Sequence, residues 1–205
     1  MLYTSITFWG FFLSVLVALQ INSRTYRSLR LQTLLLLFAS YFFYGYWDWR
    51  FLGLIIFVST QTYTAAILIE KFRKYENLFL WASISINLSV LIYFKYAGFF
   101  VQEFLSSFDL KGGGNFENII LPVGISFYIF QSFTYVFDVY SNRMKTEKDP
   151  LKYFTFIAFF PQLVAGPIER ASSLLPQFGQ LKGLKPEVFY DGVKIIIIGL
   201  FLKIF

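Results

Sequence analysis

The chain has 205 residues, of which 57% are hydrophobic and 15% are charged, and its net charge is +6. A soluble domain has about 25% charged and about 45–50% apolar residues, so this composition excludes an ordinary soluble globule and indicates a membrane protein. The excess of Lys and Arg does not indicate nucleic-acid binding, because these residues lie in short turns between apolar segments. The chain contains no Cys and no His, so its own residues cannot form disulfides, a catalytic thiol or a Ser–His–Asp triad.

Five apolar segments along the chain are predicted to cross a bilayer, which takes about 20 residues for each helix. The first has no basic residue before it and no small-residue cleavage pattern after it, so we interpret it as a retained span and not as a signal peptide. The second ends in an aromatic cluster, residues 41–49, that is typical of the membrane interface. The predicted spans cover about residues 3–21, 31–47, 51–69, 78–94 and 119–140.

The region between the fourth and fifth spans is more polar. Residues 95–110 mix charged and apolar side chains, which predicts a helix lying at the membrane surface. Residues 111–115 (KGGGN) predict a flexible loop. This loop lacks the Gly-Lys-Ser/Thr ending of a phosphate-binding loop, so it does not predict nucleotide binding.

A broken segment is predicted after the fifth span. Residues 151–168 are apolar but contain Pro161, Gly166 and Pro167, which argue against a straight spanning helix. We therefore predict a broken or re-entrant segment. Irregular backbone of this kind is tolerated at membrane depth only when it is buried in protein or lines a water-filled cavity.

The last part of the chain begins with a predicted connecting loop, residues 169–191, which has room for an interfacial helix. An apolar run then starts at Gly192 and reaches Phe205 after 14 residues. This run is shorter than the hydrocarbon core requires. We therefore expect an incomplete span from residue 192 and interpret the chain as a fragment truncated in mid-span.

The basic residues between the spans predict the orientation. The loops that follow the first to fifth spans contain three, one, three, two and four Lys or Arg residues. Since basic loops remain in the cytoplasm, this alternation places the odd-numbered loops there and the N-terminus outside. The predicted fold is all-α: a polytopic transmembrane helix bundle with a broken or re-entrant segment and interfacial helices, in which residues 1–205 form the N-terminal part of a single membrane domain.

The fifth span carries a polar stripe. At about 100° per residue, a helix brings its polar side chains to one face, with Ile125, Ile129, Phe133 and Val136 opposite. A carboxylate facing lipid costs about 2.5–3.5 kcal/mol at the membrane centre, so the stripe is expected to face protein or water. Two interpretations remain open: hydrogen bonding between helices, with Asp138 near enough to the cytoplasmic end to reach water, or one wall of a substrate passage. The stripe comprises Gly124, Tyr128, Gln131, Thr134, Tyr135 and Asp138.

Small polar residues in the third and fourth spans are interpreted as packing devices for membrane helices. They occur over residues 59–64 and at Ser83, Ser85, Asn87 and Ser89. No cluster with the spacing of metal ligands is present, so no metal site is predicted. The residues alone therefore predict a membrane enzyme or a transporter and do not distinguish between them.

Two long motifs resemble the membrane-bound O-acyltransferase family, in the branch of the bacterial alginate O-acetyltransferases, which is related to the D-alanine transfer protein of teichoic acid synthesis. The first is LPVGISFYIFQ at residues 121–131, continuing to Tyr135 and to Asp138–Tyr140. The second is FFPQLVAGPI at residues 159–168, followed by Arg170. The aromatic residues 41–50 and the YFKY sequence at residues 93–96 fit the same branch. Together these stretches extend over most of the chain.

The resemblance implies a multi-pass enzyme of the bacterial cytoplasmic (inner) membrane. Such an enzyme passes an acyl group, usually acetyl, to a hydroxyl of an extracytoplasmic polysaccharide such as alginate, or to a relay protein. It implies no bound cofactor, an acyl donor such as acetyl-CoA or another thioester on the cytoplasmic side, and a periplasmic acyltransferase as a partner. The catalytic His of the family lies in the second half of its members. No catalytic residue is therefore expected in these 205 residues, and the chain alone is expected to be inactive.

The resemblance also selects candidate site residues. Arg170 has two interpretations: it meets an acidic donor, or it is an orientation charge in the cytoplasm. The residues implied to line the core beside a water-accessible funnel, or to shape the broken segment near it, are Tyr128, Gln131, Tyr135, Asp138, Pro161, Gln162, Gly166, Pro167 and Arg170.

Two other functions remain as alternatives. A transporter or flippase also uses broken helices and intramembrane polar residues. A non-catalytic membrane scaffold is the third possibility. An intramembrane His in the remainder of the protein would favour the enzyme over the transporter. An acetylation assay of the full-length protein and its His-to-Ala form would separate the enzyme from the scaffold.

Overall fold

The computed structural model of the protein describes residues 5–107, 120–164, 166–180 and 186–204. All regular elements in these ranges are helical and none is a strand, so the predicted all-α fold is confirmed. The α-helices are α1 (Ile6–Ile21), α2 (Leu29–Asp48), α3 (Leu52–Lys71), α4 (Glu76–Ser107), α5 (Ile125–Tyr140), α6 (Pro150–Ala158), α7 (Ala171–Phe178) and α8 (Pro186–Ile204).

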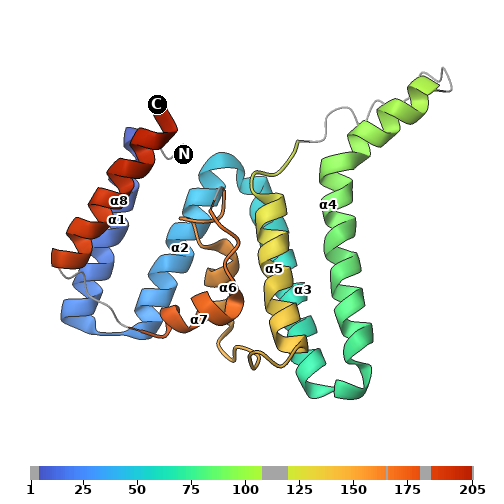
Figure 1. The fold of residues 1–205 in the computed structure, drawn as a ribbon, viewed down its shortest axis with the longest axis horizontal. Coiled ribbons are helices and arrows are strands. Elements are labelled where there is room, and N and C mark those ends of the chain that lie inside the picture. Colours follow the sequence, from blue (N-terminus) through green and yellow to red (C-terminus); the bar gives the residue numbers. More distant parts are fainter. Residues whose placement is uncertain (1–4, 108–119, 165, 181–185, 205) are drawn as a thin grey trace.

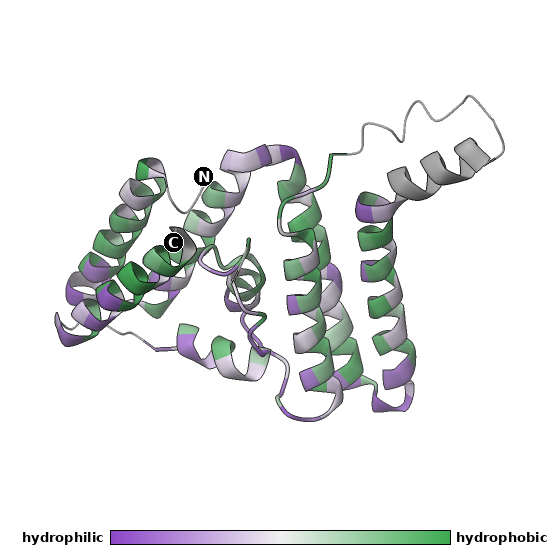
Figure 2. Ribbon diagram, turned by 45° about the horizontal axis from the view of Figure 1, so that its top comes forward, coloured by the Kyte–Doolittle hydropathy of each residue, from purple (hydrophilic) through white to green (hydrophobic). Residues whose placement is uncertain are grey.

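Three helical stretches of the described chain are long and apolar enough to cross a membrane: Ile6–Tyr26, Leu29–Lys71 and Arg73–Tyr96. The second contains α2 and α3, which run in opposite directions (Figure 1). Figure 2 shows that the long helices are mainly hydrophobic and that polar residues gather at the turns joining α2 to α3 and α3 to α4. This distribution is expected when lipid surrounds the helices and water surrounds the turns.

Local capping explains where α2 begins and ends. Ser28 precedes the helix, and its hydroxyl accepts a hydrogen bond from the Leu31 amide at 3.2 Å, so α2 starts before the predicted residue 31. At its other end Asp48 accepts a hydrogen bond from the Arg50 amide, and its carboxylate pairs with the Arg50 guanidinium at 2.6 Å. This ion pair closes the turn between α2 and α3.

The fourth spanning stretch, Arg73–Tyr96, agrees with the predicted span 78–94, and α4 continues beyond it without a break to Ser107. One predicted boundary is wrong. The fifth helix begins at Ile125 and not at residue 119, because Gly124 before it has φ = 74°, outside the right-handed helical region. Pro122 therefore precedes the helix and does not lie in its first turn. The predicted loop 111–115 lies outside the described residues.

α5 is shorter than the predicted fifth span. Its 16 residues extend about 24 Å, whereas the hydrocarbon core is about 30 Å thick. It packs against α3 and α4 on one side and against α6 and α7 on the other. α5 is thus an inner helix of the bundle.

The segment predicted to be broken is interrupted where the prolines indicated. α6 ends at Ala158, turns follow, and α7 begins at Ala171, so a short helix occupies part of the predicted connecting loop. The residues of α8 form a helix from Pro186, earlier than the predicted residue 192, with proline at the first helical position where it is favoured.

α6 lies between α2 and α3 (Figure 1). The Thr155 hydroxyl contacts the Thr33 carbonyl near the start of α2 at 3.4 Å, and the Phe160 amide donates to the Ser40 hydroxyl farther along α2 at 3.2 Å. The chain then returns, and Ser172 in α7 bonds to Asp138 near the end of α5. The segment therefore enters the bundle and leaves it at the same end, as a re-entrant segment does.

The small polar residues of α3 and α4 agree only in part with their predicted packing role. The Asn87 amide donates to the Thr62 hydroxyl at 3.3 Å and to the Ser132 hydroxyl at 3.4 Å, which joins α4 to α3 and α5 inside the bundle. Ser85 and Ser89, in contrast, are exposed on α4. They make no contact between helices there because they lie on the outer face.

Candidate functional site

The polar stripe of α5 faces the interior of the bundle. Thr134 is half-buried, and Gly124 is not part of the stripe because it precedes the helix. The other four members are buried, with at most 5% of their surface exposed: Tyr128, Gln131, Tyr135 and Asp138.

The opposite face of α5 is also largely covered. Ile125, Ile129 and Val136 are buried, because α5 has neighbours on several sides. The side chains of α5 that are exposed are Phe130 and Phe137. The helix therefore exposes two aromatic rings to lipid and directs all of its strongly polar groups inward.

Two glutamines connect α5 to both arms of the broken segment, and we call Gln131 and Gln162 the glutamine clamp. The Gln162 amide donates to the Gln131 side-chain oxygen at 3.1 Å and to the Pro167 carbonyl at 3.0 Å. The Gln131 amide donates to the Phe156 carbonyl in α6 at 3.4 Å. The clamp thus holds the end of α6 and the returning chain against the middle of α5.

Replacing Gln131 with methionine tests the clamp. The Gln162 amide would keep the Pro167 carbonyl but lose one of its two acceptors, and the buried Phe156 carbonyl would lose its side-chain donor. An unsatisfied buried group costs about 1–3 kcal/mol, so the apparent melting temperature in detergent should fall. Gln177→Met on the exposed face of α7 is the matched control and should leave the melting temperature nearly unchanged. Unfolding is monitored by intrinsic fluorescence. Equal melting curves for the two variants would show that the clamp contributes nothing to stability.

Asp138 joins α5 to α7. One carboxylate oxygen, Oδ2, accepts hydrogen bonds from the Ser172 hydroxyl at 2.8 Å and from the Ser172 amide at 3.2 Å. The other oxygen, Oδ1, lies 3.8 Å from the Arg143 guanidinium. The carboxylate thus satisfies an amide in the first turn of α7, where helices have no internal acceptors and where negative charge is favoured.

The start of α5 contacts the turn of the broken segment. A Cβ atom on Gly124 would lie 2.5 Å from the Leu163 carbonyl oxygen, so only glycine fits there. A Cβ on Gly166 would lie 2.5 Å from Cα of Gln162, so the returning chain also passes close to its own turn. These close approaches fix the position of Gln162 in the clamp.

Two tyrosines from different helices meet near this turn, and we call Tyr44 and Tyr128 the tyrosine pair. Their rings are in edge-to-face contact with centroids 6.3 Å apart. Both hydroxyls are buried, and each has the other as its polar neighbour. This hydroxyl contact and the ring contact together join α2 to α5 inside the bundle.

The other candidate residues are more dispersed. The Tyr135 hydroxyl accepts from the Glu147 amide at 3.0 Å and so holds the loop before α6. Pro161 is exposed in the turn after α6, and Pro167 is an exposed residue of the returning chain. Arg170 precedes α7 with an exposed side chain that forms no ion pair with a described residue. It does not join the clamp.

Several partners of these residues could not be identified from the sequence. Ser40, Tyr44 and Ser172 lie in other segments, and no spacing links them to α5 or to the broken segment. The aromatic cluster drew attention to Tyr44 only as an interface residue. Its role in the interior depends on the packing of α2 against α5.

The chain is similar in sequence to known bacterial acetylases and acetyltransferases. It is 34% identical over 184 residues to the probable alginate O-acetylase AlgI of Pseudomonas syringae pv. tomato, covering 87% of this chain and 35% of that protein. It is 35% identical over 185 residues to the protein of the same name from Pseudomonas aeruginosa, covering 87% of this chain and 34% of that protein. The peptidoglycan O-acetyltransferase of Helicobacter pylori is 33% identical over 199 residues, covering 82% of this chain and 37% of that protein.

The chain spans about a third of the length of these curated relatives. No family model and no solved structure matches it. The similarity nevertheless extends over most of the chain and includes relatives described as an alginate O-acetylase and as a peptidoglycan O-acetyltransferase. The chain is therefore similar, over 87% of its length, to about a third of two proteins named as probable alginate O-acetylases.

Proposed function

We propose that this chain is part of a membrane O-acetyltransferase that acts on an extracytoplasmic polysaccharide. The observation that carries the proposal is the identity of about a third with curated O-acetylases over 87% of the chain. Since those relatives are named for alginate and peptidoglycan, we propose a hydroxyl of such a polymer as the acceptor. A relay protein, such as a periplasmic acyltransferase, is the alternative immediate acceptor.

The proposed donor is acetyl-CoA or another thioester on the cytoplasmic side. In the transfer, the acceptor oxygen attacks the acetyl carbonyl carbon, a C–O bond forms, and the C–S bond breaks. A general base takes the proton of the acceptor hydroxyl, and the proton then passes to the leaving thiolate. We propose that this base is a histidine from outside these 205 residues, since none occurs among them.

We propose that the residues of this chain form one wall of the passage between donor and acceptor. The glutamine clamp holds the broken segment in place, and the tyrosine pair places two buried hydroxyls beside each other inside the bundle. Hydroxyl donors can bind the acetyl carbonyl or an acceptor hydroxyl where water is scarce. Asp138 and Tyr135 fix the elements that carry this wall.

The transferase is tested by measuring ester-linked acetate on the surface polysaccharide. Deletion of the gene should remove the ester, and the full-length protein should restore it. The full-length protein with its intramembrane His replaced by Ala should not restore the ester, even when it is as abundant in the membrane as the wild type. Equal acetylation with both forms would reject the enzyme and favour the scaffold, and an unchanged ester content after deletion would reject the function altogether.

The proposed orientation in the bacterial inner membrane has the N-terminus outside. It is supported by the basic loops and by the arrangement of the helices, since the turns after α1 and α3 lie at one end and the turn after α2 at the other (Figure 1). Labelling of single cysteines should report cytoplasm at Arg27, Lys74 and Lys145, and the outside at Asp48 and Gly113. The reverse pattern would overturn the orientation.

The transporter or flippase is not favoured, because the curated relatives are named as acetylases and acetyltransferases. The inward polar residues and the broken segment fit a passage in either class of protein. The acetate assay also separates the two classes. If the protein were a transporter, acetylation of the polysaccharide would not require an intramembrane His.

A further inference from the structure

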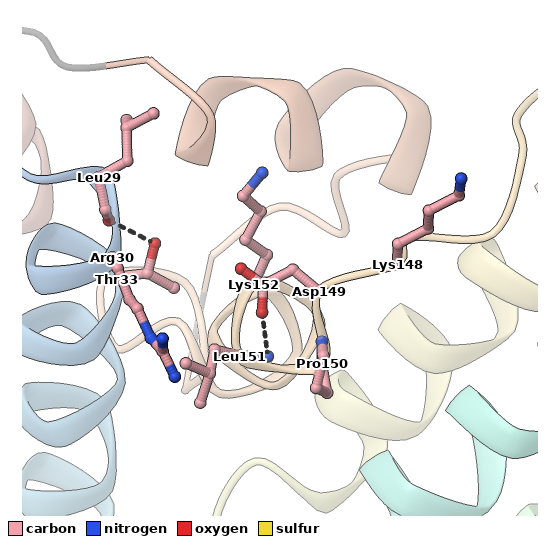
Figure 3. A pocket seen from close by; sticks show the side chains of 8 residues that line it. All are labelled: Leu29, Arg30, Thr33, Lys148, Asp149, Pro150, Leu151 and Lys152. Carbon is pink, nitrogen blue, oxygen red and sulfur yellow. Dashed lines mark hydrogen bonds between the residues drawn. The ribbon is translucent and has the colours of Figure 1, made fainter.

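A cavity of about 690 Å³ opens at the end of the bundle where the broken segment enters. We call it the basic pocket. Figure 3 shows one wall formed by the start of α2 and the other by the chain that leads into α6. Its volume lies within the range of about 300–1,000 Å³ typical of small-molecule sites. The lining residues are Leu29, Arg30, Thr33, Lys148, Asp149, Pro150, Leu151 and Lys152.

The charge of the basic pocket is strongly positive. It contains three cationic side chains, Arg30, Lys148 and Lys152, and a single carboxylate, Asp149. That carboxylate already caps α6, because it accepts a hydrogen bond from the Leu151 amide at 3.0 Å. None of the three cations forms an ion pair with another residue in the described part of the chain.

One of the cations has a structural neighbour. A Cβ on Gly179 would lie 3.7 Å from the Lys152 ammonium, which places this charge beside the end of α7. The C-terminal end of a helix carries a partial negative charge and attracts such a group. The charges of Arg30 and Lys148 have no such neighbour within the described part of the chain.

The walls of the basic pocket are held in place by hydrogen bonds. The Thr155 hydroxyl, one turn into α6, contacts the Thr33 carbonyl at 3.4 Å, and the Tyr63 hydroxyl donates to the Lys148 carbonyl at 3.2 Å. These contacts fix the chain before α6 against α2 and α3. The cations therefore surround a pre-formed cavity, whereas a charge that only sets orientation needs no cavity at all.

We propose that the basic pocket binds a phosphate group. Unpaired Arg and Lys side chains around a pre-formed cavity are the usual recognition elements for phosphate oxygens. Two sources carry this group: a phosphorylated small molecule, such as a nucleotide-containing thioester, and the headgroup of an anionic lipid. Only the nucleotide-containing thioester rests on the proposed transferase. Phosphate binding itself can be measured without any acetyl transfer.

The test uses the purified protein in nanodiscs of neutral phosphatidylcholine and pyrophosphate as the probe. The pocket variant carries Arg30→Gln, Lys148→Gln and Lys152→Gln, and the control variant carries Lys71→Gln, Lys74→Gln and Lys145→Gln, which removes the same charge from exposed positions. Calorimetry should show pyrophosphate binding that weakens at least about tenfold in the pocket variant, with the control close to wild type. Melting curves of both variants establish that they are folded.

A second arm tests the lipid source. Protein purified from phosphatidylglycerol nanodiscs is examined by native mass spectrometry for retained lipid. Phosphatidylglycerol retained by the wild type and the control, but not by the pocket variant, supports the proposal with a lipid as the ligand. If neither pyrophosphate nor phosphatidylglycerol distinguishes the pocket variant from the control, the proposal is overturned, whatever the acetate assay shows.

Discussion

Replacing Gly124 with alanine is expected to destabilise the protein strongly, because backbone strain and a steric clash act together at this position. At φ = 74° an alanine pays about 1–2 kcal/mol in backbone energy. Its Cβ would also lie 2.5 Å from the Leu163 carbonyl oxygen, and overpacking of this kind costs about 1–3 kcal/mol. The sum of roughly 2–5 kcal/mol should appear as a lower apparent melting temperature in detergent.

The same variant is expected to reduce acetylation. Leu163 follows Gln162, so a shift of its carbonyl moves the glutamine clamp and the turn it holds. Gly53→Ala in α3 is the matched control, because a Cβ there meets nothing within 4 Å and alanine favours a helix. A Gly124→Ala protein that melts like the Gly53→Ala protein would show that the contact between α5 and the turn is not tight.

Removing the Asp138 side chain is the second change with a large expected effect. In Asp138→Ala the amide and hydroxyl of Ser172 lose their shared acceptor, and each hydrogen bond to a charged group contributes about 1.5–3 kcal/mol. Arg143 also loses the carboxylate 3.8 Å away. We expect a loss of roughly 3–5 kcal/mol, seen as a lower melting temperature and as faster proteolysis of α7.

Asp138→Asn separates the two roles that the polar stripe left open. Asparagine keeps one oxygen for Ser172, so a residue that only joins α5 to α7 should retain most of its stability and most of the acetylation. Ser172→Ala should then reproduce part of the Asp138→Ala defect. Normal stability of Asp138→Asn together with abolished acetylation would instead place the carboxylate in the substrate passage.

The structure gives the inward polar residues distinct tasks. The glutamine clamp and Asp138 hold the two arms of the broken segment, one at the middle of α5 and one near its end. The tyrosine pair joins α2 to α5 and places two buried hydroxyls beside each other inside the bundle. If the chain forms part of a passage, the pair lies in its wall and the clamp supports that wall.

Much of the fold could be predicted because lipid imposes a simple rule on sequence. Apolar stretches form helices, and polar turns remain in water, so the helices over the first four predicted spans follow directly from hydropathy. Pro161 and Pro167 likewise marked the break after α6, since proline cannot continue a helix. The start of α5 was misplaced because the sequence of residues 119–124 is apolar, while Gly124 takes a left-handed conformation that composition does not reveal.

The candidate site divides in the same way. The inward direction of Tyr128, Gln131 and Asp138 could be predicted from the helical period, because polar groups on a helical stripe avoid lipid. Their partners could not, because Gln162, Tyr44 and Ser172 come from other segments that only packing brings together. The basic pocket also arises only on folding, since Arg30 and Lys148 counted along the sequence are orientation charges, and they share a cavity because α6 packs against α2. The periodicity of one helix fixes which way its side chains point. The partner of each side chain depends on how the helices pack, and packing involves segments that are distant in the sequence.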